Sequence, residues 1–474
     1  MRDRTTASAK VDMSQLRNVI GLSVDNALQG QVTGLDIMST GAPGSGSSII
    51  IRGIGSLGNS KPLIVIDGIT QDIKIGSDFD LASSNQDDIG ALLNIAPQDI
   101  KSIEVLKDAT STAVWGSKGA DGVLLIETNR GSKGKTSFNY QYKLTIQKQP
   151  PPIPMLNGDE YITMQLEELH NASGIFVVPD EIAYNTDYID FYNYSANTDW
   201  IKEITRPGIN NDHYFKMSGG GEKTTFFTSL NYSKELGTTL NEGFKRLSTR
   251  INLDYTLSKN LRFSVNFNYT NSYKDANYVF KGAATSNIRA MAYLKAPNMS
   301  VFKHDQYGNR TNEYFNPINS YQGSGIQYFN PVGIANLSEN DESSDILQNS
   351  FVFNYKMNKW INFTETISFQ YSNVKKNLFL PYTAVGADWL DSRINSSQEG
   401  NSVNDRLSAR SQLILTPIVN PTHSLITTLL YEISQNSGEW TQINGKNGPS
   451  LDIIDPAAGQ PIASLSSGSS KLRA

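Results

Sequence analysis

From about residue 134 onward, apolar and polar residues alternate along the chain with a period of two. In the segment 261–269 (LRFSVNFNY) every odd position is apolar and every even position is polar. Segments 251–257 and 361–371 alternate in the same way, with Glu365 as the exception on an apolar face. Because successive side chains of a β-strand point to opposite faces, each segment predicts a strand with one apolar and one polar face.

Nine such strands are predicted, over residues 136–148, 211–219, 223–234, 245–257, 261–273, 346–357, 360–372, 405–416 and 423–435. Their connections are alternately short and long, and the longest runs from 274 to 345. Outer-membrane β-barrels have strands of about ten residues, with short turns at one end and longer loops at the other. A soluble β-sandwich or lipocalin-like barrel also alternates, but it does not need every second loop to be long. The pattern therefore favours the membrane barrel.

The first part of the chain has a different pattern. Short, uniformly apolar runs at 49–51, 63–66, 103–106 and 123–126 lie between glycines and predict small buried strands, while 23–28 and 109–114 predict helices. We therefore expect a mixed α/β domain over residues 1–133, followed by a partial barrel over 134–474. Residues 465–474 (LSSGSSKLRA) are predicted to be a loop, so that the barrel segment ends in an extracellular loop.

Composition narrows the class of protein. The 474 residues include 41 Lys and Arg against 46 Asp and Glu, so the net charge is 41 − 46 = −5. This balance argues against a nucleic-acid partner, which would require a basic patch. The chain has no cysteine, which excludes disulfides, thiolate metal sites and cysteine nucleophiles. No segment approaches the roughly 20 apolar residues of a membrane-spanning helix, and this leaves the barrel as the membrane architecture.

Motifs typical of enzymes are present only in incomplete form. Residues 53–58 read GxGxxG but lead into a strand, whereas a dinucleotide site needs the glycines to open a helix. Residues 41–48 lack the lysine of a phosphate loop, and 78–82 has Ala82 where a calcium ligand belongs. The four histidines are scattered, and no GxSxG elbow occurs. We predict no catalytic residue, cofactor or metal ligand, and therefore no enzyme.

The first domain carries a series of spaced motifs: SVDNALQGQVTG at 23–34, GAPGSGSSIIIRGIG at 41–55, PLIVIDG at 62–68, NIAPQDIKSIEVLKDA at 94–109 and AVWGSKGADGVLLIET at 113–128. This series closely resembles the plug domain of the SusC/RagA family of TonB-dependent outer-membrane transporters, over about residues 14–133. The positions that carry the resemblance include Arg52, Gly53, Gly55, Asp67, Gly68, Glu104, Lys107, Asp108, Gly116, Gly119 and Gly122.

The resemblance implies a 22-stranded barrel with a plugged lumen, of which about nine strands are present here. The family's signal sequence and TonB box are not visible ahead of Met13, so we hypothesise a truncated sequence, the alternative being a barrel completed by a second chain. The implied function is import of a large nutrient, a glycan or less often a peptide, across the outer membrane. The implied partners are the TonB–ExbB–ExbD complex, a SusD-like surface lipoprotein and outer-membrane lipid.

Two other classes remain open at this point. One is a non-transporting outer-membrane receptor or adhesin with the same architecture, and the other is a soluble all-β enzyme. Charges in the plug motifs (Arg52, Lys101, Glu104, Lys107 and Asp108) could pair with polar groups of the barrel lumen or could simply be solvated. Substrate contacts are expected from loops, with these candidates: Ser56, Asn59, Lys61, Trp200, Tyr321, Tyr328 and Trp389. Packing within the loops is the alternative role of these aromatic residues.

Overall fold

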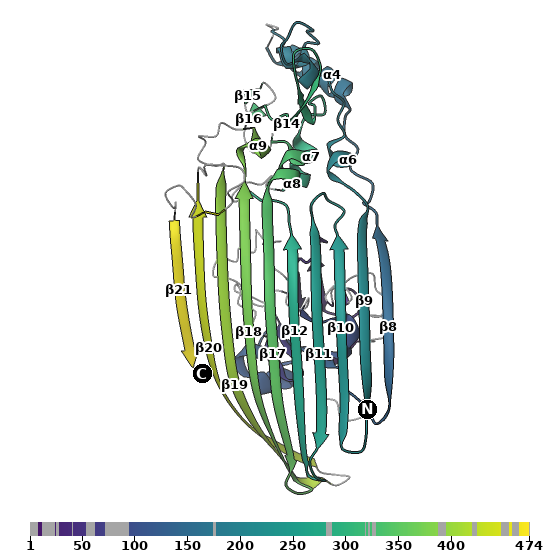
Figure 1. Cartoon of the computed structure of the whole chain (residues 1–474), viewed down its shortest axis with the longest axis vertical. Coiled ribbons are helices and arrows are strands. Elements are labelled where there is room, and N and C mark those ends of the chain that lie inside the picture. Colours follow the sequence, from purple (N-terminus) through teal and green to yellow (C-terminus); the bar gives the residue numbers. More distant parts are fainter. Residues whose placement is uncertain are drawn as a thin grey trace.

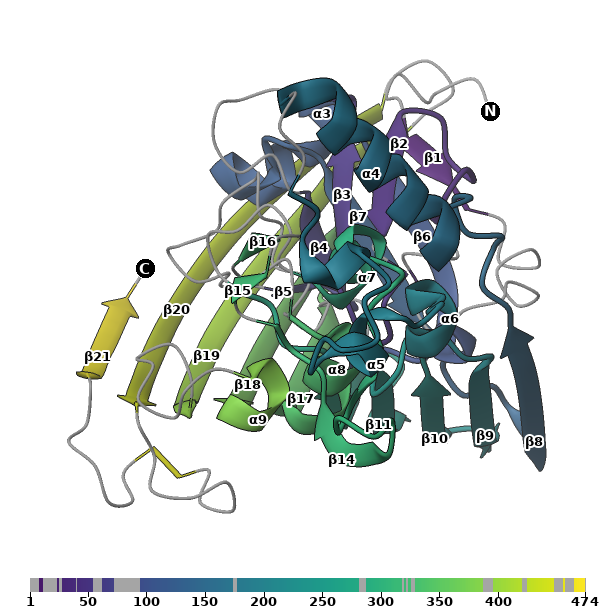
Figure 2. The same cartoon turned by 90° about the horizontal axis from the view of Figure 1, so that it is seen from above.

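The computed structural model describes residues 8–11, 24, 28–39, 41–53, 62–71, 94–173, 177–280, 287–317, 319–320, 323–324, 329–386, 395–419, 424–446, 455–456 and 464–473. A small N-terminal domain lies against one face of a large sheet, and the sheet curves around it (Figures 1 and 2). We call these parts the plug and the barrel sheet. Helices and hairpins from the long connections lie above one end of the barrel sheet (Figure 1).

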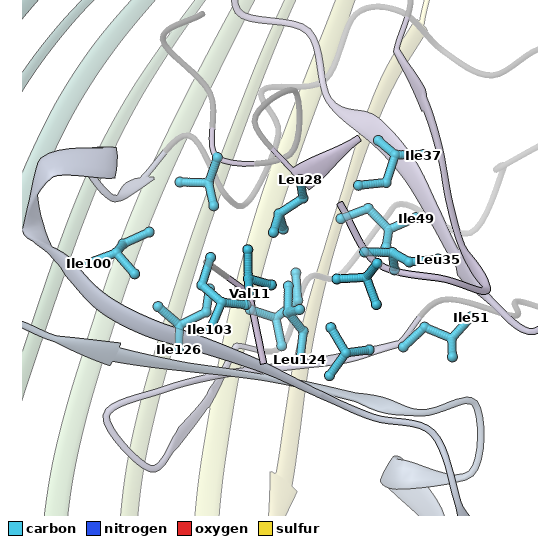
Figure 3. Packing of buried hydrophobic residues seen from close by; sticks show 14 of the residues in the cluster. Val11, Leu28, Leu35, Ile37, Ile49, Ile51, Ile100, Ile103, Leu124 and Ile126 are labelled. Carbon is cyan, nitrogen blue, oxygen red and sulfur yellow. The ribbon is translucent and has the colours of Figure 1, made fainter. Parts of the chain in front are cut away.

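The plug is built on a five-stranded sheet in the order β1-β6-β7-β4-β5. Its strands are β1 (Ser8–Lys10), β6 (Ile100–Leu106), β7 (Val123–Thr128), β4 (Leu63–Ile66) and β5 (Ile69–Gln71). Only β4 and β7 pair in parallel. The hairpin of β2 (Leu35–Ser39) and β3 (Ser47–Ile51) packs its isoleucines against this sheet, where they form one apolar core with residues such as Ile103 and Leu124 (Figure 3). The four strands predicted in this domain are confirmed.

The helix predicted over 109–114 is shorter than expected. It is α3 (Ala109–Thr112), and the chain continues as a 3₁₀ segment, η3 (Ala113–Gly119), with a kink at Gly116. A second 3₁₀ turn, η2 (Pro97–Asp99), precedes β6. Most of the helix predicted over 23–28 lies outside the described residues, but Val24 and Leu28 are helical and buried.

The barrel sheet has ten described strands, each antiparallel to its neighbours, in the order β21-β20-β19-β18-β17-β12-β11-β10-β9-β8. They are β8 (Gly134–Gln147), β9 (Gly208–Gly220), β10 (Thr224–Leu236), β11 (Gly243–Thr256), β12 (Leu261–Asp275), β17 (Glu339–Lys356), β18 (Ile361–Leu380), β19 (Ser396–Val419), β20 (Ser424–Gly445) and β21 (Ser464–Arg473). All nine predicted strands are present, and the last four extend well beyond their predicted ends at the long-loop side.

The end of the sequence differs from its prediction. Where a loop was expected over 465–474, the chain forms β21, which pairs with β20 from Asn444↔Ser464 to Gln435↔Arg473. The expected loop after Tyr431–Ile433 is likewise wrong, because β20 continues to Gly445. Five serines and Gly468 hide the alternation in β21, so backbone pairing with β20, rather than a side-chain pattern, makes this segment a strand.

The alternation predicted for the barrel strands is confirmed, and the polar face is the buried one. In β11, Arg246, Arg250 and Asn252 are buried, whereas Leu247 and Ile251 are exposed. The polar face covers the plug and the apolar face points away from it, as in barrels with a lipid-facing exterior.

The long connections fold into a cap above the barrel sheet. The β8–β9 connection contains α4 (Gly158–Ser173), η4 (Asp180–Ile182), α5 (Phe191–Tyr194) and α6 (Trp200–Ile204). The β12–β17 connection contains α7 (Ile288–Leu294), β13 (Phe302–His304), β14 (Arg310–Tyr314), β15 (Asn319–Ser320), β16 (Gly323–Ser324) and α8 (Pro331–Leu337), and the β18–β19 connection contains α9 (Tyr382–Val385). Their apolar faces share two cores. None of the described helices is long and apolar enough to cross a membrane.

Candidate functional site

The plug and the barrel sheet meet through buried charged groups. Arg250 of β11 points inward, and its Nη1 lies 3.3 Å from the Asp67 Oδ2 of the plug. Its Nε lies 3.7 Å from the Asp99 Oδ2, and its Nη2 donates to Asn268 of β12. The three charged side chains are only 3–6% exposed. We call Arg250, Asp67 and Asp99 the Arg250 cluster.

Local plug structure explains how the two carboxylates reach Arg250. Asp67 and Gly68 form the β4–β5 hairpin turn with φ of 50° and 86°, the positive values that a type I′ turn requires. The Thr128 amide and hydroxyl, at the end of β7, donate to the two Asp67 oxygens at 2.9 and 2.7 Å. The turn and the adjacent strand end thus hold the carboxylate rigidly toward the barrel sheet.

Asp99 ends the η2 turn and is 3% exposed. The Tyr214 hydroxyl of β9 donates to its Oδ1 at 2.8 Å. Burial raises the pKa of the Asp99 carboxyl, while Arg250 and hydrogen bonds from Ser229 and Tyr214 act in the opposite direction. A buried carboxylate is costly unless it is paired, so both plug acids depend on barrel residues for compensation.

Two further contacts extend the charged interface along β9 to β12. Arg130, just after β7, donates to Asp254 at 3.0 Å, and Arg262 reaches the other oxygen of the same carboxylate, also at 3.0 Å. Gln98 of the plug donates to the buried Asp212 of β9 at 2.7 Å. The same carboxylate also accepts a hydrogen bond from Asn231 of β10. The plug is therefore held on this side by ionic and charge-assisted hydrogen bonds, which are stronger than neutral ones.

The contacts of the plug with β17 to β19 are of a different kind. Gln348 of β17 donates to the Gln71 side chain at 2.5 Å. Gln370 of β18 donates to the Thr70 carbonyl at 3.4 Å. Arg410 donates to the Gly68 carbonyl at 3.4 Å and stacks over Trp115 at 4.3 Å. Among the described residues no ion pair joins the plug to this side of the barrel sheet. Over the residues that the structure describes, the interface thus contains ion pairs on one side, and hydrogen bonds with one cation–π contact on the other.

In the described part of the chain, the plug charges singled out in the sequence have their partners inside the plug, which favours the solvated alternative over pairing with the barrel lumen. Arg52 pairs with Asp108 inside the plug at 2.5 Å, and Lys107 donates to the Thr33 carbonyl. Lys101 pairs with the plug's own Glu127, with both side chains more than 60% exposed. Glu104 lies on β6 opposite Lys10 of β1. These contacts link strands and loops within the plug. Because they are open to solvent, the charges need no partner on the barrel sheet.

The motif glycines lie mainly at turns of the plug. Gly68 is in the β4–β5 turn, and Gly53, Gly116 and Gly122 also have positive φ. Gly122 is also crowded, because a Cβ there would lie 2.7 Å from the Ile51 Cδ1. Gly119 ends η3, and Gly55 lies outside the described residues.

Of the predicted substrate contacts, only Trp200 lies within the described residues. Trp200 is 3% exposed, its Nε1 donates to the Ala296 carbonyl at 3.0 Å, and Lys295 lies over its ring. It belongs to the core of the cap, so it offers no open face to a sugar, and packing is its role in the structure. The other six candidates, namely Ser56, Asn59, Lys61, Tyr321, Tyr328 and Trp389, lie outside the described residues.

Sequence reasoning missed Asp99, Arg130, Arg250 and Asp254 as contacts between the domains. A signal was present in β11, whose polar face carries Arg246, Arg250 and Asp254 among small residues. Full charges on the face of a strand that covers another domain predict buried pairing. Within the described part of the chain, no group of His, Asp and Glu side chains is placed to hold a metal ion.

Comparison with known proteins agrees with this architecture. Residues 1–123 match the family described as TonB-dependent Receptor Plug Domain. The chain is 27% identical over 403 residues to TonB-dependent receptor P39 of Formosa agariphila, which covers 84% of this chain and 34% of the relative. It is 29% identical over 360 residues to TonB-dependent receptor SusC of Bacteroides thetaiotaomicron, covering 74% and 33%. The chain thus spans about a third of the length of these curated relatives.

Solved structures show the same fold. The RagAB peptide importer in its closed-closed state matches with a TM-score of 0.73 at 20% identity, over 99% of this chain and 52% of that one. The unliganded ferric citrate transporter FecA matches with a TM-score of 0.56 at 9% identity, over 99% and 52%. A plug seated on the polar face of a large antiparallel sheet defines an outer-membrane receptor of the TonB-dependent class. Within that class, the chain is similar in sequence to SusC and in fold to the RagAB importer.

Proposed function

We propose that this chain forms the plug and the adjoining barrel wall of an importer that takes up a large nutrient across the outer membrane. The supporting observation is the buried polar interface between plug and barrel sheet. An apolar interface between plug and barrel sheet would hold the plug permanently. Hydrogen bonds and ion pairs, in contrast, can be exchanged for contacts with water when the plug moves. The plug thus closes the barrel lumen and moves to open it during import.

The energy for this movement comes, in this proposal, from the TonB–ExbB–ExbD complex, because the plug matches the family of TonB-dependent receptors. The cap of loop helices faces the exterior and is the surface on which a SusD-like lipoprotein would act. We propose a glycan as the substrate, as the resemblance to SusC implies, with a peptide as the alternative that the fold shared with the RagAB peptide importer supports.

A disulfide lock between plug and barrel tests the gating proposal. The chain has no cysteine, so an engineered pair has no competing thiol within it. The Asn252 Nδ2 of β11 donates to the Thr128 Oγ1 of the plug at 3.1 Å, so these two short side chains meet and Thr128→Cys with Asn252→Cys is a suitable plug–barrel pair. Ser368 and Ser408 face each other on β18 and β19 with hydroxyl oxygens 2.6 Å apart, so Ser368→Cys with Ser408→Cys is the matched control inside the barrel sheet.

Both variants are placed in the genomic copy, and uptake of labelled oligosaccharides and peptides is measured under oxidising and reducing conditions. We expect the plug–barrel pair to abolish uptake until it is reduced, while the control pair imports in both states. Uptake through the oxidised plug–barrel pair would refute gating by the plug. Ligand binding without uptake in the unmodified protein would instead indicate the non-transporting receptor.

A further inference from the structure

Two lysines face each other on the outside of the barrel sheet. Lys234 of β10 is directly opposite Lys245 of β11 in the strand register. Their neighbours show which way they point. Ser233 and Arg246 are 0% and 1% exposed on the inner face, whereas Tyr232 and Leu247 are 42% and 39% exposed on the outer face. Because side chains alternate, Lys234 and Lys245 lie on the outer face with Tyr232 and Leu247.

This arrangement is unfavourable without an anion. Like charges directly opposite in adjacent strands destabilise a sheet, since their Cβ atoms are only about 5 Å apart. Among the described residues neither ammonium group forms an ion pair. Lys245 is instead held over the Tyr273 ring of β12, with its Nζ 5.3 Å from the ring centre. Within the described part of the chain, the sheet thus presents two adjacent positive charges with no carboxylate in contact.

The height of Lys234 and Lys245 along the barrel strands shows which part of the membrane they face. One row closer to the short turns, Tyr142, His213 and Tyr232 lie side by side, with ring centres 4.8 and 6.4 Å apart. Still closer to the short turns, the outer face is apolar, with Phe263 and Phe353 in contact at 4.7 Å. Aromatic rings mark the membrane–water interface of outer-membrane barrels. The lysines therefore lie at the height of lipid headgroups, on the side of the long loops.

The acidic residues nearby confine the positive patch to this level. Asp275 of β12 faces Asp341 of β17 one row further toward the long loops. The lysine row itself continues through Tyr273 and Ser343 to Lys375 of β18. Asp345 of β17 lies one row closer to the short turns. An anion is thus attracted at the lysine row and repelled by the acidic residues of β12 and β17 above and below it.

The geometry points to a binding site for the phosphate of an outer-leaflet lipid, formed by Lys234 and Lys245 on the barrel exterior. A phosphate has several oxygens and can accept from both ammonium groups at once, which removes their mutual repulsion. Its acyl chains would then cover the apolar band below the aromatic row. The site extends beyond nutrient import and does not depend on it, because it faces away from the plug.

The test measures binding of a fluorescent diphosphorylated lipid A to the detergent-solubilised receptor. We expect Lys234→Gln with Lys245→Gln to weaken binding about tenfold, which corresponds to about 1.4 kcal/mol. The charge-preserving variant Lys234→Arg with Lys245→Arg should bind as the unmodified protein does. Lys259 and Lys359 lie in short turns at the opposite end of the strands, so Lys259→Gln with Lys359→Gln is the control for loss of two positive charges.

Heat-modified electrophoretic mobility confirms that each variant is folded. Dephosphorylated lipid A should bind the unmodified receptor as weakly as the phosphorylated lipid binds the glutamine variant. The proposal is overturned if the glutamine variant and the turn control bind equally, or if removing the phosphates has no effect. Full displacement by millimolar inorganic phosphate would also overturn it, since the site would then recognise the free anion rather than the lipid.

Discussion

Arg250 on the barrel sheet and Asp67 in the plug, 183 positions apart in sequence, lie within 3.3 Å of each other and are both almost fully buried. The same guanidinium lies 3.7 Å from Asp99, so one barrel side chain compensates two plug carboxylates. This relationship makes Arg250 the residue on which the seating of the plug depends most strongly.

Arg250→Met should loosen the plug. Removing one partner of a buried ion pair costs about 3–5 kcal/mol, because the remaining charges are left uncompensated. We expect faster hydrogen exchange in β6 and β7 and ion conductance through the receptor in planar bilayers. Arg262→Gln is the matched control, since Arg262 also pairs with an aspartate but is 53% exposed, and its loss leaves Asp254 paired with Arg130. Equal exchange in the two variants would contradict the role given to Arg250.

Gly122→Ala should destabilise the plug more than Gly68→Ala. Both glycines have positive φ, 97° and 86°, and that conformation costs a residue with a side chain about 1–3 kcal/mol. At Gly122 the new Cβ would also lie 2.7 Å from Ile51, and overpacking adds about 1–3 kcal/mol, whereas no atom lies within 4 Å at Gly68. Hydrogen exchange of β3 and β7 measures the difference, and similar rates in both variants would show that the contact with Ile51 yields freely.

The cap should become more stable as the pH rises above neutral. Burial lowers the pKa of Lys295 to about 7, against 10.5 for the unperturbed group. Between these values the folded cap binds fewer protons than the unfolded chain, so its stability increases with pH, by on the order of 5 kcal/mol across the whole interval. Lys295→Met should remove this dependence and slow exchange in α6 and α7 at neutral pH. Lys202→Met, on the exposed side of α6, is the control. An unchanged pH profile in Lys295→Met would exclude this lysine as its origin.

Leu253→Arg should impair insertion into membranes. Leu253 lies on the outward apolar face of β11, between Phe226 and Val265 in the strand register. A charge on the lipid face of a barrel costs about 2–4 kcal/mol near the middle of the bilayer and about 0–1 kcal/mol at the interface. Leu257→Arg, just after β11 at the short-turn end, should therefore have little effect. Folding yield in lipid vesicles is the measurement, and equal yields would place Leu253 outside the lipid-facing band.

Much of the fold was accessible from sequence because it depends on local patterns. The period-two alternation located the nine predicted strands, and the glycine-bounded apolar runs located β3, β4, β6 and β7. The pattern was insufficient where polar residues occupy both faces, as in β21 and in the upper part of β19. There the strand is stabilised by backbone hydrogen bonds to its neighbour. These bonds form whatever the side chains are, so alternation does not reveal them.

The candidate site was harder to predict from the sequence than the fold was. Arg52, Lys107 and Asp108 are among the positions that carry the resemblance to plug domains, yet they pair inside the plug, whereas Asp99 and Arg250 are not among the predicted site residues. By itself the sequence determined the domain type, the alternating strands and which face of each strand is polar, since these follow from residue order along a few neighbouring positions. Only the tertiary structure decided which polar residues meet across the interface. Those contacts depend on the register of the strands and on the orientation of the plug, and both are set by packing between segments far apart in the chain.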